Sequence, residues 1–173
     1  MKAPTHSRVL YLARGGIIAA LYVVLTYVAY TMNLSGQLSV QLRLSEALTV
    51  LPYFTSAAIP GLTLGCLIAN IITGAAIWDV LFGTLATLIG AVGTYLLRKY
   101  RFAASVPPIL ANTVIIPFVL KIAYQLPDAA WLLALSVFLG ELICCGVLGT
   151  ILQSVLIRFP HLLGSEPKNK SDM

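Results

Sequence analysis

Charged side chains are scarce in this chain. Only 10% of its 173 residues are Asp, Glu, Lys or Arg, whereas 59% are hydrophobic and the mean hydropathy is +0.92. An ordinary soluble domain has about 25% charged residues. A soluble domain of this size could not bury so much apolar surface. The composition therefore excludes the soluble classes and predicts an all-α integral membrane protein.

The residues that most enzymes need are also scarce. The two histidines, His6 and His161, lie in the polar ends of the chain, which leaves no Ser–His pair and no His-rich metal site. Only one Asp lies in an apolar segment, so an aspartyl pair is excluded. There is no G-x-x-x-x-G-K-[ST] loop for nucleotide hydrolysis. We therefore expect no catalysis, no metal site and no cofactor in this chain.

The three cysteines lie inside apolar stretches, with no second thiol at metal-ligand spacing and no paired disulfide framework. We interpret them as small packing residues, because a buried cysteine behaves as a small hydrophobic side chain. They are Cys66, Cys144 and Cys145.

Long apolar runs make up most of the chain. Residues 44–78 contain one charge, and as a single helix they would be about 52 Å long, whereas a bilayer core is about 30 Å thick. The segment must fold back, and Pro52 with the stretch 55–61 supplies the break. In that stretch Pro60 removes a backbone donor and Gly61 permits a tight turn. The predicted structure is one membrane domain, 1–173, with a polar cytoplasmic tail at 158–173. Its six transmembrane helices are expected near 15–32, 44–57, 60–77, 79–97, 105–126 and 129–157.

The basic residues support this count. Nine of the eleven lie in three clusters, at the start of the chain, at 98–101 and in the C-terminal tail. The positive-inside rule places all three clusters in the cytoplasm, which requires an even number of crossings between them. Six helices satisfy that requirement and predict a multi-pass protein of the cell membrane with both termini cytoplasmic. The two other cations, Arg43 and Lys121, fall towards the outside.

The segment before the second predicted helix alternates apolar and polar residues from Leu38 to Ser45. This period of two is typical of a strand, and it predicts an extended outer loop across the mouth of the bundle. An irregular loop that alternates by chance remains the alternative.

Polar groups inside the apolar segments are the candidate functional residues, because an ionisable group costs about 2.5–3.5 kcal/mol to insert into a membrane. In the six-helix arrangement they converge on the outer half, and the inner half has almost none. This asymmetry favours an outward-facing pocket over a through-channel. Acids and amides together suit a ligand with several N–H donors, a cationic group, or both. The candidates are Gln41, Arg43, Glu46, Asn70, Asp79, Asn112 and Glu141.

Structural explanations of the same residues remain open. Arg43 and Glu46 are three residues apart and could form an ion pair at a helix start. Asp79 could only favour the start of its helix, and Asn70 and Asn112 could join helices by hydrogen bonds.

Glu141 is harder to explain structurally, because it lies twelve residues into the last predicted helix, counting from Ala130. Tyr30, Tyr53 and Trp78 could stack on a flat heterocycle or belong to an interfacial belt.

The first predicted helix carries two overlapping pairs of small residues four apart. Such a surface lets another helix approach closely. It could pack on a neighbouring helix of this chain or dock another membrane subunit. The four residues are Gly15, Gly16, Ala19 and Ala20.

The stretches QLRLSEALTVLPYF, PGLTLGCLIAN and WDVLFGTLATL resemble the QueT family, the substrate-binding S components of energy-coupling factor (ECF) transporters for queuosine precursors. The resemblance runs from Ala19 to Glu141. It implies capture from outside of a deazaguanine such as 7-aminomethyl-7-deazaguanine. It also implies a transmembrane coupling protein that meets the small residues of the first helix, and two cytoplasmic ATPases that use ATP.

Under this resemblance we expect two of Glu46, Asp79 and Glu141 to bind the guanine edge and the aminomethyl cation of the ligand. Amides at Gln41, Asn70 and Asn112 would bind its carbonyl and ring nitrogens. Which acid binds the guanine edge and which binds the aminomethyl cation stays open. The alternatives are an S component for another vitamin-like heterocycle, a carrier that works without an ATPase, and a non-transport membrane assembly protein.

Overall fold

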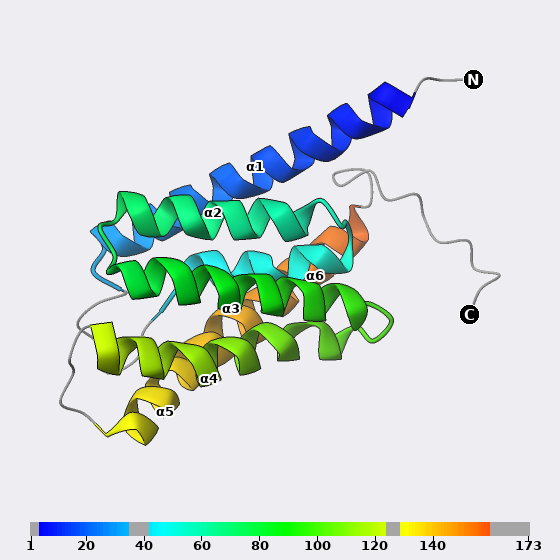
Figure 1. The fold of residues 1–173 in the computed structure, drawn as a ribbon. Helices are drawn as coiled ribbons and strands as arrows, with labels where there is room; N and C mark the ends of the chain where they lie inside the picture. The colour runs from blue at the N-terminus through cyan, green and yellow to red at the C-terminus, as the bar shows by residue number, and fades with distance from the viewer. Residues whose placement is uncertain (1–3, 35–41, 124–128, 160–173) are drawn as a thin grey trace.

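The computed structural model describes residues 4–34, 42–123 and 129–159, and within these ranges it is helical without strands. Six helical segments run back and forth through a bundle (Figure 1). The first four are α1 (Pro4–Thr31), η1 (Leu44–Tyr53), α2 (Ala58–Ile72) and α3 (Ile77–Leu96).

The last two segments are compound. A short 3₁₀ turn, η2 (Phe102–Ser105), leads into α4 (Val106–Ala123). The sixth consists of α5 (Ala130–Glu141), the π-helical η3 (Leu142–Leu148) and α6 (Gly149–Arg158). The predicted six helices are thus present in the described residues, with ends that shift by several residues.

Four of these segments are long and apolar enough to cross a membrane: Ser7–Thr31, Ile77–Leu96, Phe102–Ala123 and Ala130–Arg158. Ala58–Ile72 is a shorter apolar helix. The chain is therefore a membrane protein by the length and composition of its helices.

Basic residues from each of the three clusters lie at one end of the bundle. Figure 1 shows the start of α1, the α3–α4 connection and the end of α6 at this end, and the end of α1 with the starts of η1 and α3 at the other. Arg8, Arg98 and Arg158 thus lie at the same end, as an even number of crossings requires. That this end is cytoplasmic is still a prediction from charge.

The η1 segment lies in the middle of the bundle, in contact with α1, α2, α3, η3 and α6 (Figure 1). It is a 3₁₀ helix of 10 residues with Pro52 inside it, whereas 3₁₀ runs longer than about four residues are uncommon. Three residues per turn place Glu46 and Thr49 on one face, and the Thr49 hydroxyl donates to the Glu46 carbonyl at 2.6 Å.

The second helix begins at Leu44, as predicted, although it is a 3₁₀ helix. The alternating pattern that ends at Leu44 and Ser45 therefore does not continue as an extended segment there. The rest of the predicted loop, 35–41, lies outside the described residues.

The reversal after η1 also differs from the prediction. The chain turns at 54–57, and both Pro60 and Gly61 lie in the first turn of α2. A proline is tolerated there because the first helical N–H groups have no partner in the helix. Gly61 is needed for packing instead, since a Cβ on it would lie 2.7 Å from the Gly15 carbonyl oxygen.

The α1–α2 contact forms the larger apolar core. Ile18 and Tyr22 of α1 pack there with Leu62, Cys66 and Ala69 of α2. The helices approach closely because Gly65, like Gly61, has no side chain between them. Tyr22 is thereby fixed beside η1, where the polar cluster begins.

Candidate functional site

The three candidate acids are buried in the interior, not exposed to lipid. Glu46 is 0%, Asp79 6% and Glu141 4% exposed. They come from three elements: the start of η1, the first turn of α3 and the end of α5. Buried acids need hydrogen-bond or ionic partners, and those partners define two adjoining groups of side chains.

Glu46 is the centre of the first group. The Tyr22 hydroxyl donates to its Oε1 at 2.5 Å, and the Asn112 amide donates to its Oε2 at 3.5 Å. Asn112 is itself 0% exposed, and its Oδ1 has no hydrogen-bond partner. An unused acceptor therefore lies beside the Glu46 carboxylate.

Cys145 joins Glu46 to Glu141. Its thiol donates to Glu141 Oε2 at 3.0 Å and lies 3.3 Å from both the Glu46 carbonyl oxygen and the Thr49 hydroxyl. Glu141 directly precedes the π-helical η3, which carries Cys145. Such π segments are frequent at functional sites, and here one follows the buried acid.

The second group is the ion pair of Arg43 with Asp79. Arg43 Nη2 lies 3.2 Å from Asp79 Oδ1 and 3.4 Å from Oδ2. The Asn70 amide donates to the Asp79 carbonyl oxygen at 3.4 Å, so α2 and α3 are joined there. Burial lowers the pKa of the Arg43 guanidinium, but the Asp79 carboxylate raises it, and the net pKa lies above its ordinary value.

The structure brings together six of the seven candidate residues. Arg43, Asp79 and Asn70 form one group, and Glu46, Asn112 and Glu141 the other. Gln41 lies outside the described residues.

The alternative of an ion pair between Arg43 and Glu46 was wrong, because Arg43 pairs with Asp79. The Glu46 carboxylate instead accepts hydrogen bonds from Tyr22 and Asn112. For Asn70, its bond to Asp79 fits the role of joining helices. Lys121 is exposed in the last turn of α4.

Sequence reasoning missed four polar members of the site. Tyr22, Thr49 and Cys145 contact the acids, and Cys66 accepts from Asn70 at 3.6 Å and from Thr87 at 3.3 Å. Cys66 thus packs in the apolar core, as predicted, and also accepts hydrogen bonds, whereas Cys145 contacts the acids directly. A usable signal was that Cys145 follows Glu141 by four residues, which places both on one face of a helix.

One trio could hold a metal ion. Single ligand atoms of Glu46, Glu141 and Cys145 lie within 4.8 Å of one another, and all three residues are buried. Two carboxylates and a thiol suit a divalent ion such as zinc. The sequence had predicted no metal site, so this trio is a candidate that only the fold assembles.

Tyr30, Tyr53 and Trp78 do not come together as a stacking surface for a heterocycle. Trp78 stacks on Phe82 with ring centroids 5.9 Å apart and is 47% exposed. Tyr53 is the last residue of η1, at the end of the bundle opposite to Trp78 and Tyr30. Trp78 and Tyr30 remain at the end near the acids, where an interfacial role explains their exposure.

The inner half also contains a buried polar side chain that the prediction lacked. Gln153 of α6 is 0% exposed, and neither its Nε2 nor its Oε1 has a hydrogen-bond partner. It lies two turns of helix beyond Cys145. The half of the bundle that is predicted to be inner therefore contains one buried amide that the sequence analysis did not name.

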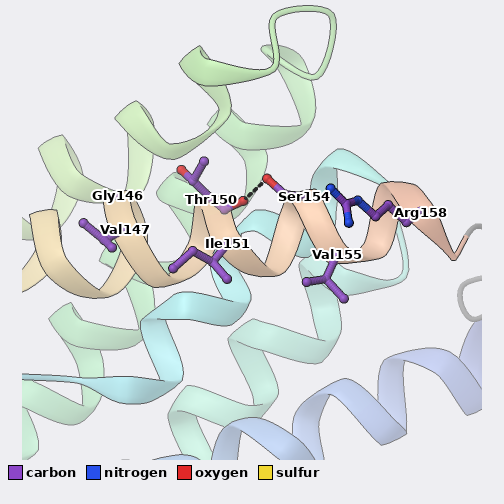
Figure 2. A pocket seen from close by; sticks show the side chains of 7 residues that line it. All are labelled: Gly146, Val147, Thr150, Ile151, Ser154, Val155 and Arg158. Atoms are coloured by element: carbon purple, nitrogen blue, oxygen red, sulfur yellow. Dashed lines mark hydrogen bonds between the residues drawn. The ribbon is translucent and has the colours of Figure 1, made fainter.

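A surface groove of about 460 Å³ lies along one face of η3 and α6 (Figure 2). Its lining includes Thr150, Ser154 and Arg158 and none of the candidate residues. Ser154 donates to the Thr150 carbonyl oxygen at 2.7 Å and accepts from Arg101 at 2.7 Å, so its hydroxyl is already used. The groove is separate from the acid cluster.

The small residues of α1 face two ways. Gly15 and Ala19 face α2, because Cβ atoms on Gly61 and Gly65 would lie 2.7 and 3.0 Å from their carbonyl oxygens. Gly16 and Ala20 are exposed, and a Cβ on Gly16 would meet nothing within 4 Å. One pair therefore packs inside this chain, and the other stays open.

One comparison with known proteins gives a match. The model of the QueT transporter family matches residues 12–158, which is most of the chain. The chain belongs to the QueT transporter family. No curated protein and no solved structure matches it.

Membership makes this QueT chain a membrane transport protein, and the family is one of transporters, not of enzymes. The matched range includes the described acids and their partners, from Tyr22 to Cys145. The buried polar cluster is therefore a candidate site for the transported solute.

Proposed function

We propose that this QueT protein is the S component of an ECF-type importer and captures a queuosine precursor, a deazaguanine such as 7-aminomethyl-7-deazaguanine, from outside the cell. The observation that carries the proposal is the buried cluster around Glu46 and Glu141, with its unused acceptor on Asn112. Membership of a transporter family makes a bound solute the natural partner of such a cluster.

The acceptors and donors of the cluster match a guanine-like ligand. A guanine edge presents N–H donors that a carboxylate accepts in a bidentate manner, and its carbonyl accepts from an amide or guanidinium. The aminomethyl group is a cation that requires an acid. Three acids, two amides and one guanidinium in adjoining groups provide all of these partners.

The energy for uptake would come from other subunits. We propose that a transmembrane coupling protein docks on α1 and that two cytoplasmic ATPases use ATP, while this chain binds no cofactor itself. The exposed pair Gly16 and Ala20 supports the docking step, because small residues let a partner helix approach closely. In this arrangement the chain supplies recognition and the partners supply energy.

Calorimetric titration of the purified protein with 7-aminomethyl-7-deazaguanine tests the proposal. We expect saturable binding at one site, and a loss of about tenfold or more in affinity for Glu46→Gln, because hydrogen bonds to a charged group contribute about 1.5–3 kcal/mol. Lys121→Gln, an exposed charge outside the cluster, is the matched control.

Absence of binding to the wild-type protein would reject the proposed ligand. Adenosine and thiamine in the same titration separate the proposed ligand from other heterocycles. Co-purification with a coupling protein and ATPases separates an S component from a carrier that works alone or an assembly protein.

A further inference from the structure

The two groups of the site differ in their charge balance. Asp79 is neutralised by Arg43 at 3.2 Å. Glu46 and Glu141 make no ion pair with any residue of the described ranges 4–34, 42–123 and 129–159. Since ligand atoms of these two acids lie within 4.8 Å of each other, any negative charge on them is concentrated in one place.

The elements packed around the two glutamates supply neutral partners. α1 contributes the Tyr22 hydroxyl, α4 the Asn112 amide and η3 the Cys145 thiol. None of these three groups carries a positive charge at neutral pH. Arg43 is near enough to interact electrostatically with both glutamates, but its ion pair is with Asp79. A buried carboxylate pair with no cation in direct contact is costly, so the arrangement favours a ligand that brings its own positive charge.

A second observation also indicates such a ligand. Asn112 is 0% exposed, and its Oδ1 is an acceptor without a partner. Its Nδ2 lies 3.5 Å from Glu46 Oε2, so this acceptor lies beside the carboxylate. A primary ammonium group has three N–H donors, and the cluster offers three acceptor side chains: the carboxylates of Glu46 and Glu141 and the amide oxygen of Asn112.

We infer that Glu46, Glu141 and Asn112 form the subsite for the ammonium group of the ligand, and that Asp79 with Arg43 does not. This inference rests on the proposed function and assigns the roles that the sequence left open. The heterocycle then extends towards Arg43, Asp79 and Asn70, whose guanidinium, carboxylate and amide suit its polar edge. Selectivity for a cationic ligand is thus determined by the two glutamates.

The test compares two ligands that differ in charge. Wild-type protein, Glu46→Gln, Glu141→Gln and Asp79→Asn are each titrated with 7-aminomethyl-7-deazaguanine, a cation, and with 7-cyano-7-deazaguanine, which is neutral. Wild type should prefer the cation by about tenfold or more, the usual scale of a charge-assisted contact. Both Gln variants should lose most of this preference, whereas Asp79→Asn should weaken both ligands equally and keep the ratio.

An unchanged ratio in both Gln variants, or a ratio lost only in Asp79→Asn, would overturn the assignment. Failure of wild type to bind either ligand would instead reject the proposed function. A preference that disappears in EDTA and returns with zinc would show that Glu46, Glu141 and Cys145 hold a metal ion, and would also overturn it.

Wild-type protein gives a second measurement if a Gln variant does not fold. Adding methyl groups to the ammonium keeps its charge but removes N–H donors one at a time. We expect the affinity to fall with each methyl group and the trimethylated ligand to lose at least tenfold. Equal affinity across the series would contradict an ammonium subsite built from three acceptors.

Discussion

At the level of single residues, Gly83 shows how little space the side chains of the site leave around them. It lies one turn after Asp79 in α3, and a Cβ on it would lie 3.1 Å from Asp79 Oδ1 and 3.3 Å from Asn70 Nδ2. Both contacts are tighter than nine in ten real Cβ contacts, so the two side chains would have to move by a few tenths of an ångström. The absence of a side chain here therefore permits the Arg43–Asp79–Asn70 arrangement.

Gly83→Ala should destabilise the protein by about 1 kcal/mol. Overpacking costs about 1–3 kcal/mol, and the better helix propensity of alanine returns up to about 1 kcal/mol. Thermal unfolding in detergent measures the change. The matched control is Gly16→Ala, where a Cβ would meet nothing within 4 Å. Only the stabilisation from the better helix propensity of alanine should remain there. Equal shifts for the two variants, or a higher unfolding temperature for Gly83→Ala, would contradict the packing argument.

The individual acids were predictable, but their partners were not. Glu46, Asp79 and Glu141 are visible because charges are so rare in apolar segments. Tyr22 and Cys145 are ordinary residues of apolar helices, and only the close approach of α1, η1 and η3 makes them part of the site. The Arg43–Asp79 pair joins residues 36 apart in the sequence, so no local pattern indicates it.

At the level of elements, Tyr22 joins the site to the close contact between α1 and α2, called the α1–α2 seam below. A Cβ on Gly65 would lie 2.8 Å from Tyr22 Cβ and 3.0 Å from the Ala19 carbonyl oxygen. The Tyr22 hydroxyl is the donor to Glu46 Oε1. A change in the distance between the two helices must therefore reach the carboxylate.

Gly65→Ala should lower both stability and ligand affinity, although residue 65 is not among the hydrogen-bond partners of the acids. The Cβ clashes with backbone as well as with a side chain, so we expect a destabilisation of about 2–3 kcal/mol, at the upper end of overpacking. Affinity should fall about tenfold as Tyr22 moves from Glu46.

Unfolding temperature and titration of the same sample measure both effects of Gly65→Ala. Tyr22→Phe is the companion variant, which removes only the hydroxyl. Loss of stability with unchanged affinity would show that the seam and the site are independent.

The type of the helices was less predictable than their number. Charge clusters and apolar lengths were enough for six segments. Glu46 lies in the 3₁₀ helix η1, and Cys145 lies in the π-helical η3. These helix types were not predictable, because hydropathy does not record the spacing of backbone hydrogen bonds. The position of the turn before α2 was misjudged because Pro60 is compatible with a first helical turn as well as with a break.

On the scale of the whole molecule, the distribution of cations makes a topology prediction. Lys99 lies at the end of the bundle with the basic clusters, and Lys121 lies in the last turn of α4 at the other end; both are exposed. In intact cells, a membrane-impermeant maleimide should label Lys121→Cys but label Lys99→Cys only after permeabilisation. The native cysteines are at most 2% exposed and give little background. The opposite labelling pattern would invert the orientation and the outward-facing site.

The outer face of α1 leads to a last prediction, about assembly. Ala19 and Ala20 are neighbours in sequence, but Ala19 packs against Gly65 of α2, whereas Ala20 is exposed. If the coupling protein docks on the open face, Ala20→Leu should fold and bind ligand like wild type and yet fail to co-purify with the coupling protein, because the larger side chain prevents close approach. Ala19→Leu should instead unfold at a lower temperature, since its side chain enters the α1–α2 seam. Normal co-purification of Ala20→Leu would place the docking surface elsewhere. Comparison of the two variants therefore distinguishes packing inside the chain from assembly with a partner.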